Sequence, residues 1–161
     1  MPAGNTYEAI ATTTLGSSSS SVTFSSISGA YTDLVLVIAG TMSSGDATSV
    51  QVNSDTGSNY SSTRLYGDGT TATSDRLTSQ TKSALGLMMP AQSVFTVHFM
   101  NYANTTTYKT FLGRSSAASG FVEAAVGLWR NTAAITSITA TTAGQTYQTG
   151  STFSLYGIKA A

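Results

Sequence analysis

The stretch Val94-Phe95-Thr96-Val97-His98-Phe99-Met100 decides the fold of this chain. Apolar and polar residues alternate along it, and successive side chains of a β-strand point to opposite faces. An extended strand therefore places both phenylalanines and Val97 on one face, and Thr96, His98 and Met100 on the other. The first face is typical of a protein core, so the stretch predicts a half-buried β-strand.

Further runs of the same kind recur along the whole chain, separated by Gly, Ser, Asn and Asp residues that favour turns. The runs cover 7–14, 21–27, 33–39, 49–53, 60–66, 83–88, 94–102, 108–112, 121–129, 135–141 and 152–158. About ten short strands at a spacing of roughly 8 to 12 residues indicate an all-β protein, an antiparallel sandwich or barrel.

The 161 residues are predicted to form a single domain, 1–161, in which residues 1–6 are a possible N-terminal arm. No internal repeat or linker divides the chain. The longest weakly patterned segment is 67–82. A loop of that length either packs on the domain as an excursion or contacts something outside it, and the sequence leaves both interpretations open.

Charge is scarce: only 9% of the residues are charged, and seven Lys and Arg balance seven Asp and Glu. Without a basic run, we expect no nucleic-acid partner. The longest apolar run, 34–39, is too short to span a bilayer, and the N-terminus lacks the pattern of a signal peptide, so we expect no membrane partner and synthesis in the cytoplasm.

The sequence predicts no catalytic residue, no metal site and no cofactor, and therefore no enzyme. Cysteine is absent, and His98 is the only histidine that could act as a base. The acidic residues are scattered singly, mostly beside glycines or before strands, which favours turn positions over a catalytic pair. An oxygen-rich calcium site built from Asn53, Asp55, Asp68 and Asp75 lacks any EF-hand spacing.

Five residues are instead candidates for an interface with a partner, namely Tyr66, His98, Trp129, Arg130 and Asn131. A tyrosine or tryptophan ring commonly anchors protein interfaces or stacks on sugars, and a guanidinium beside a flat ring at the end of a strand commonly makes a contact. Alternation places Trp129 on the face of Glu123, away from Val122 and Val126, which makes Trp129 a candidate for a second packing surface. The alternative for each aromatic residue is that its side chain only fills space within a strand of the sheet and contacts no partner.

Five motifs resemble a family of small virion proteins of tailed phages, cyanophages above all. They are Tyr31-Thr32-Asp33-Leu34-Val35, Leu65-Tyr66-Gly67-Asp68-Gly69, Gly127-Leu128-Trp129, Ile135-Thr136-Ser137-Ile138 and Leu155-Tyr156-Gly157-Ile158-Lys159. The resemblance spans nearly the whole chain. Its motifs are strands and turns, so they indicate relatives without indicating a site.

The resemblance implies a jelly-roll-like β-sandwich on the virion surface that often forms a homotrimer. Such proteins decorate and cement capsids by bridging the capsomers of the major capsid protein, or sit on tails as fibre tips. A small lone domain without heptads or repeated shaft strands favours capsid cement. The alternatives are a tail-fibre or receptor-binding module that binds a host surface glycan and, third, a virion-associated glycan hydrolase.

Overall fold

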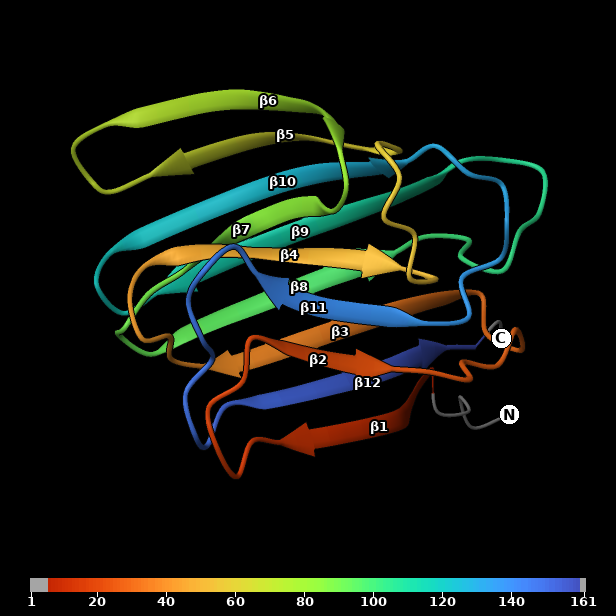
Figure 1. The fold of residues 1–161 in the computed structure, drawn as a ribbon, viewed down its shortest axis with the longest axis horizontal. Coiled ribbons are helices and arrows are strands. Elements are labelled where there is room, and N and C mark those ends of the chain that lie inside the picture. Colours follow the sequence, from red (N-terminus) through yellow and green to blue (C-terminus); the bar gives the residue numbers. More distant parts are fainter. Residues whose placement is uncertain (1–5, 160–161) are drawn as a thin grey trace.

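The computed structural model describes residues 6–159, which form twelve β-strands in two antiparallel sheets packed face to face (Figure 1). The larger sheet has the order β1 (Tyr7–Thr14), β12 (Thr152–Ile158), β3 (Asp33–Gly40), β8 (Ser93–Phe99), β9 (Lys109–Ala117), β10 (Phe121–Trp129), β5 (Tyr60–Gly67), β6 (Ala72–Gln80). The smaller sheet has the order β2 (Ser21–Phe24), β11 (Ile138–Thr142), β4 (Asp46–Val52), β7 (Ser83–Met88). The predicted all-β, antiparallel β-sandwich is therefore confirmed.

The strand order is that of a jelly roll with two added hairpins. Without β5–β6 and β9–β10, the two sheets read β1-β12-β3-β8 and β2-β11-β4-β7. Along the chain, these eight strands alternate between the sheets except for the antiparallel pair β4 and β7. Two interlocked Greek keys give this order, which defines the jelly roll. Both hairpins extend the larger sheet beyond β8.

The core lies between the two sheets and is filled by inward-facing aliphatic and aromatic side chains. Phe95, Val97 and Phe99 of β8 are fully buried, as their alternation predicts. Phe99 packs on Phe111 of β9 with ring centroids 5.0 Å apart. No helix within residues 6–159 is long and apolar enough to cross a membrane.

Strand β7 lies unusually close to β9 and β10, and glycines make this approach possible. A Cβ atom at Gly127 would lie 2.3 Å from Oγ of Ser83 and 2.9 Å from Cδ2 of Leu85. A Cβ atom at Gly113 would lie 2.8 Å from the backbone oxygen of Leu85. All three distances are shorter than real Cβ contacts, so glycine is the residue that fits at these two positions.

Four predicted strands, β1, β7, β10 and β12, have the bounds that the sequence predicts, whereas the weakly patterned segment 67–82 contains strand β6. β6 is an edge strand with no fully buried residue, which explains why it shows no hydrophobic alternation. Residues 1–5 of the predicted arm lie outside the described residues. Thr6 accepts a backbone hydrogen bond of 3.0 Å from Lys159.

Candidate functional site

The five predicted interface residues do not form one surface. His98 lies on the outward side of β8, with its Nε2 atom 3.0 Å from Oδ2 of Asp33. Tyr66 lies on the inward side of β5, opposite Glu123 of β10. Trp129, Arg130 and Asn131 follow one another where β10 ends. The surroundings of these residues differ from one another.

Trp129 is a core residue, and its prediction as an interface residue is wrong. Its side chain is 1% exposed, stacks on Tyr60 with ring centroids 6.4 Å apart, and donates a hydrogen bond from Nε1 to Asp55. The face that Trp129 shares with Glu123 is the one that packs against the smaller sheet. A partner cannot reach the indole while the sandwich is intact.

Arg130 and Asn131 bind their own chain. Arg130 donates from Nη1 to Oγ of Ser61, and from Nη2 to the backbone oxygens of Ser58 and Tyr60. Oδ1 of Asn131 accepts a hydrogen bond from the backbone of Ala133. The contacts of Arg130 fasten the end of β10 to the start of β5, and the bond of Asn131 closes a local turn, so both residues have a structural role.

Tyr66 belongs to a charged cluster on the inward side of the added hairpins. Its ring stacks on Phe121 with centroids 6.0 Å apart, and the guanidinium of Arg64 lies 5.8 Å from the centroid of Tyr66. Arg64 donates from Nε and Nη2 to the two carboxylate oxygens of Asp75. The bidentate pairing lowers the pKa of the Asp75 carboxyl.

Glu123 is the buried member of this cluster, with a side chain 1% exposed. Its Oε2 atom accepts a hydrogen bond of 2.9 Å from the backbone of Leu87 on β7. Its Oε1 atom lies 3.7 Å from Nη1 of Arg64, too far for a hydrogen bond, and makes none among the described residues. Burial raises the pKa of this carboxyl, more than Arg64 and Leu87 lower it. Glu123 thus links β10 of the larger sheet to β7 of the smaller sheet.

Other acidic side chains hold loops. Oδ2 of Asp46 accepts three backbone hydrogen bonds, from Ala143, Gly144 and Gln145, which fix the connection between β11 and β12. Asp68 accepts from Thr71 and Thr70, and these bonds lower its pKa to about 2. Within residues 6–159, no group of three or more His, Cys, Asp or Glu side chains could hold a metal ion.

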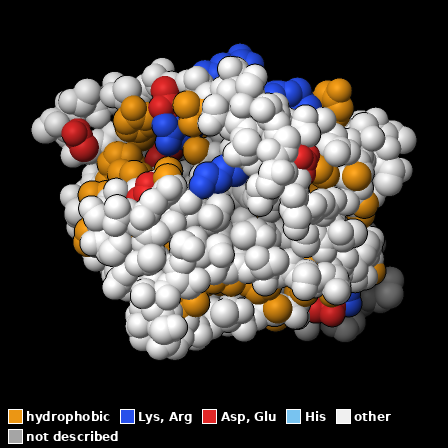
Figure 2. Space-filling model, in the orientation of Figure 1, with side chains coloured by type: hydrophobic (Ala, Val, Ile, Leu, Met, Phe, Trp, Pro, Cys, Tyr) orange, Lys and Arg blue, Asp and Glu red, His pale blue; other side chains and the backbone are white. Residues whose placement is uncertain are grey.

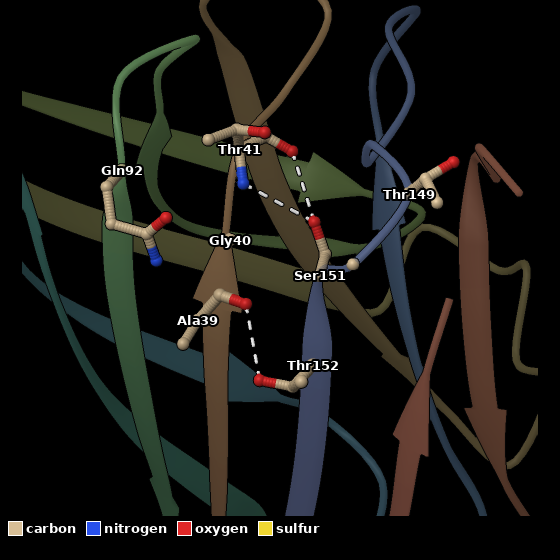
Figure 3. Close-up of a pocket in the computed structure, with 8 residues that line it drawn as sticks. Ala39, Gly40, Thr41, Gln92, Thr149, Ser151 and Thr152 are labelled. Carbon is tan, nitrogen blue, oxygen red and sulfur yellow. Dashed lines mark hydrogen bonds between the residues drawn. The ribbon is translucent and has the colours of Figure 1, made fainter. Parts of the chain in front are cut away.

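A polar hollow of about 250 Å³ lies where β3 ends and β12 begins (Figure 3). The hydroxyl of Ser151 donates to the backbone oxygen of Thr41, and that of Thr152 donates to Ala39. A Cβ atom at Gly40 would lie 2.2 Å from Oγ of Ser151. These two hydroxyl groups therefore tie the end of β3 to the start of β12.

The outward side of the larger sheet offers the most extensive candidate surface. We call the exposed aliphatic residues of β5, β8, β9 and β10 on this side the apolar patch. They are Leu65, Val94, Leu112, Val122 and Val126, between 44% and 62% exposed. Among residues 6–159, no further layer covers this side of the sheet. Exposed aliphatic side chains that gather on one face mark an interaction surface.

The register of the strands places Arg114 at the centre of this surface. Arg114 lies opposite Thr96 of β8 and Ala124 of β10, and Ala124 in turn lies opposite Leu65. The adjacent row pairs Leu112 with Val126. Arg114 is exposed, and its guanidinium makes no hydrogen bond or ion pair among residues 6–159. The guanidinium of Arg114 thus lies among the aliphatic side chains of Leu112 and Ala124 and the hydroxyl side chains of Thr96 and Ser116.

Small residues hollow out one end of the patch. Gly67, Ala72 and Ala124 are outward-facing, and Leu65 and Val122 stand beside them. The resulting hollow has a volume of about 520 Å³ and a mostly apolar lining, to which the inward-facing residues Tyr66, Thr73 and Glu123 also contribute. It could receive an apolar side chain of a partner.

The opposite face of the molecule differs. In Figure 2, with the smaller sheet in front, most of the surface is neither hydrophobic nor charged. Several of its outward positions are hydroxyl residues, such as Thr23 and Thr139, whose Oγ1 atoms are 2.9 Å apart. Hydrophobic and charged side chains gather at the upper left, towards the end of β5 and the starts of β6 and β10.

No known protein family and no curated protein matches the chain. Among solved structures, the galectin LEC-6 of Caenorhabditis elegans is similar, with 8% sequence identity over 89% of this chain and 94% of that chain and a TM-score of 0.42. The alginate lyase Aly36B in complex with alginate tetrasaccharide has 9% identity over 81% of this chain and 72% of that chain, with a TM-score of 0.33. Neither match bears on the activity or ligand of this chain.

Reasoning from the sequence missed Arg114 and the apolar patch. Val122 and Val126 alternate with Glu123 and Ala125, a pattern that does not say which side faces water. The residues that identify the inner side are Gly127 and Gly113, since glycines on one side of a strand indicate close approach of another backbone. That side is the inner one, so the valines face outward.

Proposed function

We propose that the chain is a capsid cement or decoration protein of a tailed phage, which stabilises the head by bridging capsomers of the major capsid protein. The observation that carries the proposal is the apolar patch: five exposed aliphatic residues on the uncovered side of a rigid eight-stranded sheet. A protein that works by docking needs a surface of this kind and no catalytic residue.

The strand and turn motifs supply the phage context. The motif Leu155 to Lys159 covers the second half of β12, the last strand along the chain, and Tyr31 to Val35 leads into its neighbour β3. The jelly-roll order of the sheets agrees with the fold that the resemblance implies. The proposed location is the capsid surface of the virion, and the proposed assembly is a homotrimer.

Cementing is a multivalent function. Each copy adds a modest buried area across a joint between capsomers, and many copies together resist the pressure of the packaged DNA. The low charge of the chain suits close packing of copies, because neighbouring copies repel one another weakly.

The alternative, a glycan-binding tail module, loses the residue on which it depended. Trp129 is buried, and so are Tyr60, Tyr102 and Tyr147, while the exposed Tyr7 and Tyr108 lie apart, on β1 and just before β9. Sugar-binding surfaces rely on exposed aromatic rings. The exposed aliphatic surface therefore favours a protein partner.

A cryo-EM map of virions of the phage that encodes the chain tests the proposal. We expect density for the twelve-stranded sandwich at joints between capsomers, and heads that lack the protein should break at lower temperature than complete heads. Density confined to a tail tip, with normal heat resistance of the depleted heads, would refute the cement role and leave host recognition.

A further inference from the structure

We propose that the outward side of β8, β9, β10, β5 and β6 is the face that docks on the capsid, and that Arg114 pairs there with a carboxylate of the major capsid protein. This inference rests on the proposed function and adds to it the docking face and the chemistry of the partner. The first argument comes from charge. The outward side carries the free guanidinium of Arg114 and the exposed Arg76 of β6, and none of its outward positions on these five strands is acidic.

An exposed arginine among aliphatic side chains has the composition of an interface centre. Arginine is enriched at binding hot spots, and its planar guanidinium can bind both oxygens of a carboxylate. Leu112 and Val126 beside it would exclude water once a partner covers them, and the exclusion of water strengthens the ion pair. The partner surface should therefore be apolar around one or two acidic residues.

The hollow beside Val122 supplies a second anchoring point. An apolar side chain of the partner would rest on Gly67, Ala72 and Ala124, between Leu65 and Val122. The guanidinium and the hollow lie on neighbouring strands of one rigid sheet, so they fix the orientation of the partner as well as its position.

The size of the face predicts weak binding by a single copy. Five strands spaced by about 4.8 Å, with seven residues of about 3.3 Å each, cover roughly 550 Å². Stable interfaces bury about 800 Å² on each partner. One copy should therefore bind the capsid weakly, and a trimer should bind it far more tightly through several identical contacts.

Two other occupants fit less well. A second copy of the chain, placed face to face, would bring Arg114 and Arg76 of each copy towards those of the other, and the face offers no acid to neutralise them. An acidic polysaccharide would satisfy the arginines, but the outward positions of these five strands include no Trp, Tyr or Phe on which a sugar ring could stack.

Binding of the purified protein to capsids stripped of it, taken from the phage that encodes the chain, tests the inference. Val126→Glu and Arg114→Glu should each lower the affinity about tenfold or more, and Arg114→Lys should retain part of the binding. Thr23→Glu is the matched control for Val126→Glu, because it adds the same single negative charge at an exposed site on the opposite face, and it should bind as the wild type does. Circular dichroism confirms that each variant is folded.

The outcomes separate the two proposals. If the wild-type protein does not bind capsids, the cement role itself fails. If it binds and both patch variants bind equally well, or if only Thr23→Glu loses binding, the assignment of the docking face is wrong. If the wild-type protein is a dimer and Val126→Glu dissociates it, a second copy of the chain covers this face. If the wild-type protein binds polygalacturonate, and Arg114→Glu abolishes this binding but leaves capsid binding unchanged, the partner of this face is a polysaccharide. Both results would overturn the inference.

Discussion

Nε1 of Trp129 donates a hydrogen bond of 2.7 Å to Oδ2 of Asp55. The two residues lie far apart in the chain, and this bond joins the end of β10 to the turn that precedes β5. Asp55 also accepts from the backbone of Gly57 and the side-chain amide of Asn59. Burial opposes ionisation of Asp55, but these donors outweigh it, and the pKa of the carboxyl falls below its ordinary value. The indole is thus a structural anchor.

Replacing this anchor should cost stability without changing the surface. Trp129→Phe keeps an aromatic ring in the core but removes the N–H donor and leaves a smaller side chain. We expect the free energy of unfolding to fall by about 1–3 kcal/mol, measured by urea denaturation followed by circular dichroism. Tyr108→Phe, at a site 56% exposed, is the control and should have little effect. Equal stability of Trp129→Phe and the wild type would contradict the anchoring role.

Gly127 should tolerate no side chain. In Gly127→Ala, the new methyl group would collide with Ser83, Leu85 and Phe111, all within 3.0 Å, and would push β7 away from β10. We expect a loss of about 1–3 kcal/mol of stability and a lower melting temperature. Gly144→Ala is the matched control, since nothing lies within 4 Å of a Cβ atom there. A stable Gly127→Ala variant would mean that the two sheets can separate at little cost.

Asp46 should make stability depend on acid pH. Burial opposes ionisation of Asp46, but backbone N–H groups donate to it and lower its pKa below 3.8. Its contribution to stability is therefore complete above the unfolded-state pKa and is lost as the pH falls through the folded-state pKa. Thermal unfolding between pH 5 and pH 2 should show a smaller decline for Asp46→Asn than for the wild type. The same slope in both proteins would refute the assignment.

Glu123 should act in the opposite direction. Its pKa is raised mainly by burial, so the folded state binds this proton more tightly than the unfolded chain does. Its contribution is complete below the unfolded-state pKa of about 4.3 and is lost as the pH rises through the folded-state pKa. Glu123→Gln keeps an oxygen for the backbone N–H of Leu87. We expect this variant to gain stability relative to the wild type as the pH rises from 4 to 7, and an unchanged difference would contradict the prediction.

The mass of the protein in solution tests the proposed trimer directly. The resemblance implies threefold assembly, and β1 and β6 are both open edges of the larger sheet that an assembly could cover. Light scattering at micromolar concentration should give about three times the chain mass of 16.5 kDa. A mass of one chain over this concentration range would count against the trimer.

Much of the fold could be predicted from the sequence, because alternation reports burial wherever one side of a strand faces the core. Phe95 and Phe99 identify the inward side of β8 in this way. The prediction fails for β6, Ala72–Gln80, because a strand with both sides near water needs no alternation. Alternation also fails to identify the inner side of β10, because close approach of β7 at the middle of this strand leaves room only for the small residues Ala125 and Gly127 between Glu123 and Trp129.

The candidate site could be predicted far less well. Arg64 and Glu123 lie 59 positions apart, and only the pairing of β5 with β10 brings them together. Arg114 became a candidate only when the register placed it among residues of three other strands. The proposed role of Trp129 failed for a related reason. Amphipathic rings serve interfaces and cores alike, and only the position of the strand relative to the second sheet distinguishes the two.

The hairpins β5–β6 and β9–β10 lie outside the eight strands that make up the jelly roll, yet they carry most of the outward apolar patch. The strands that form the scaffold and the strands that carry the docking surface can therefore change independently during evolution. Substitutions at outward positions of these hairpins can follow changes in a host structure over generations, while the two Greek keys stay constant. Related chains that share the jelly roll should diverge fastest at the positions of Leu65, Leu112, Arg114 and Val122, and an exchange of both hairpins between two such chains should exchange their partners.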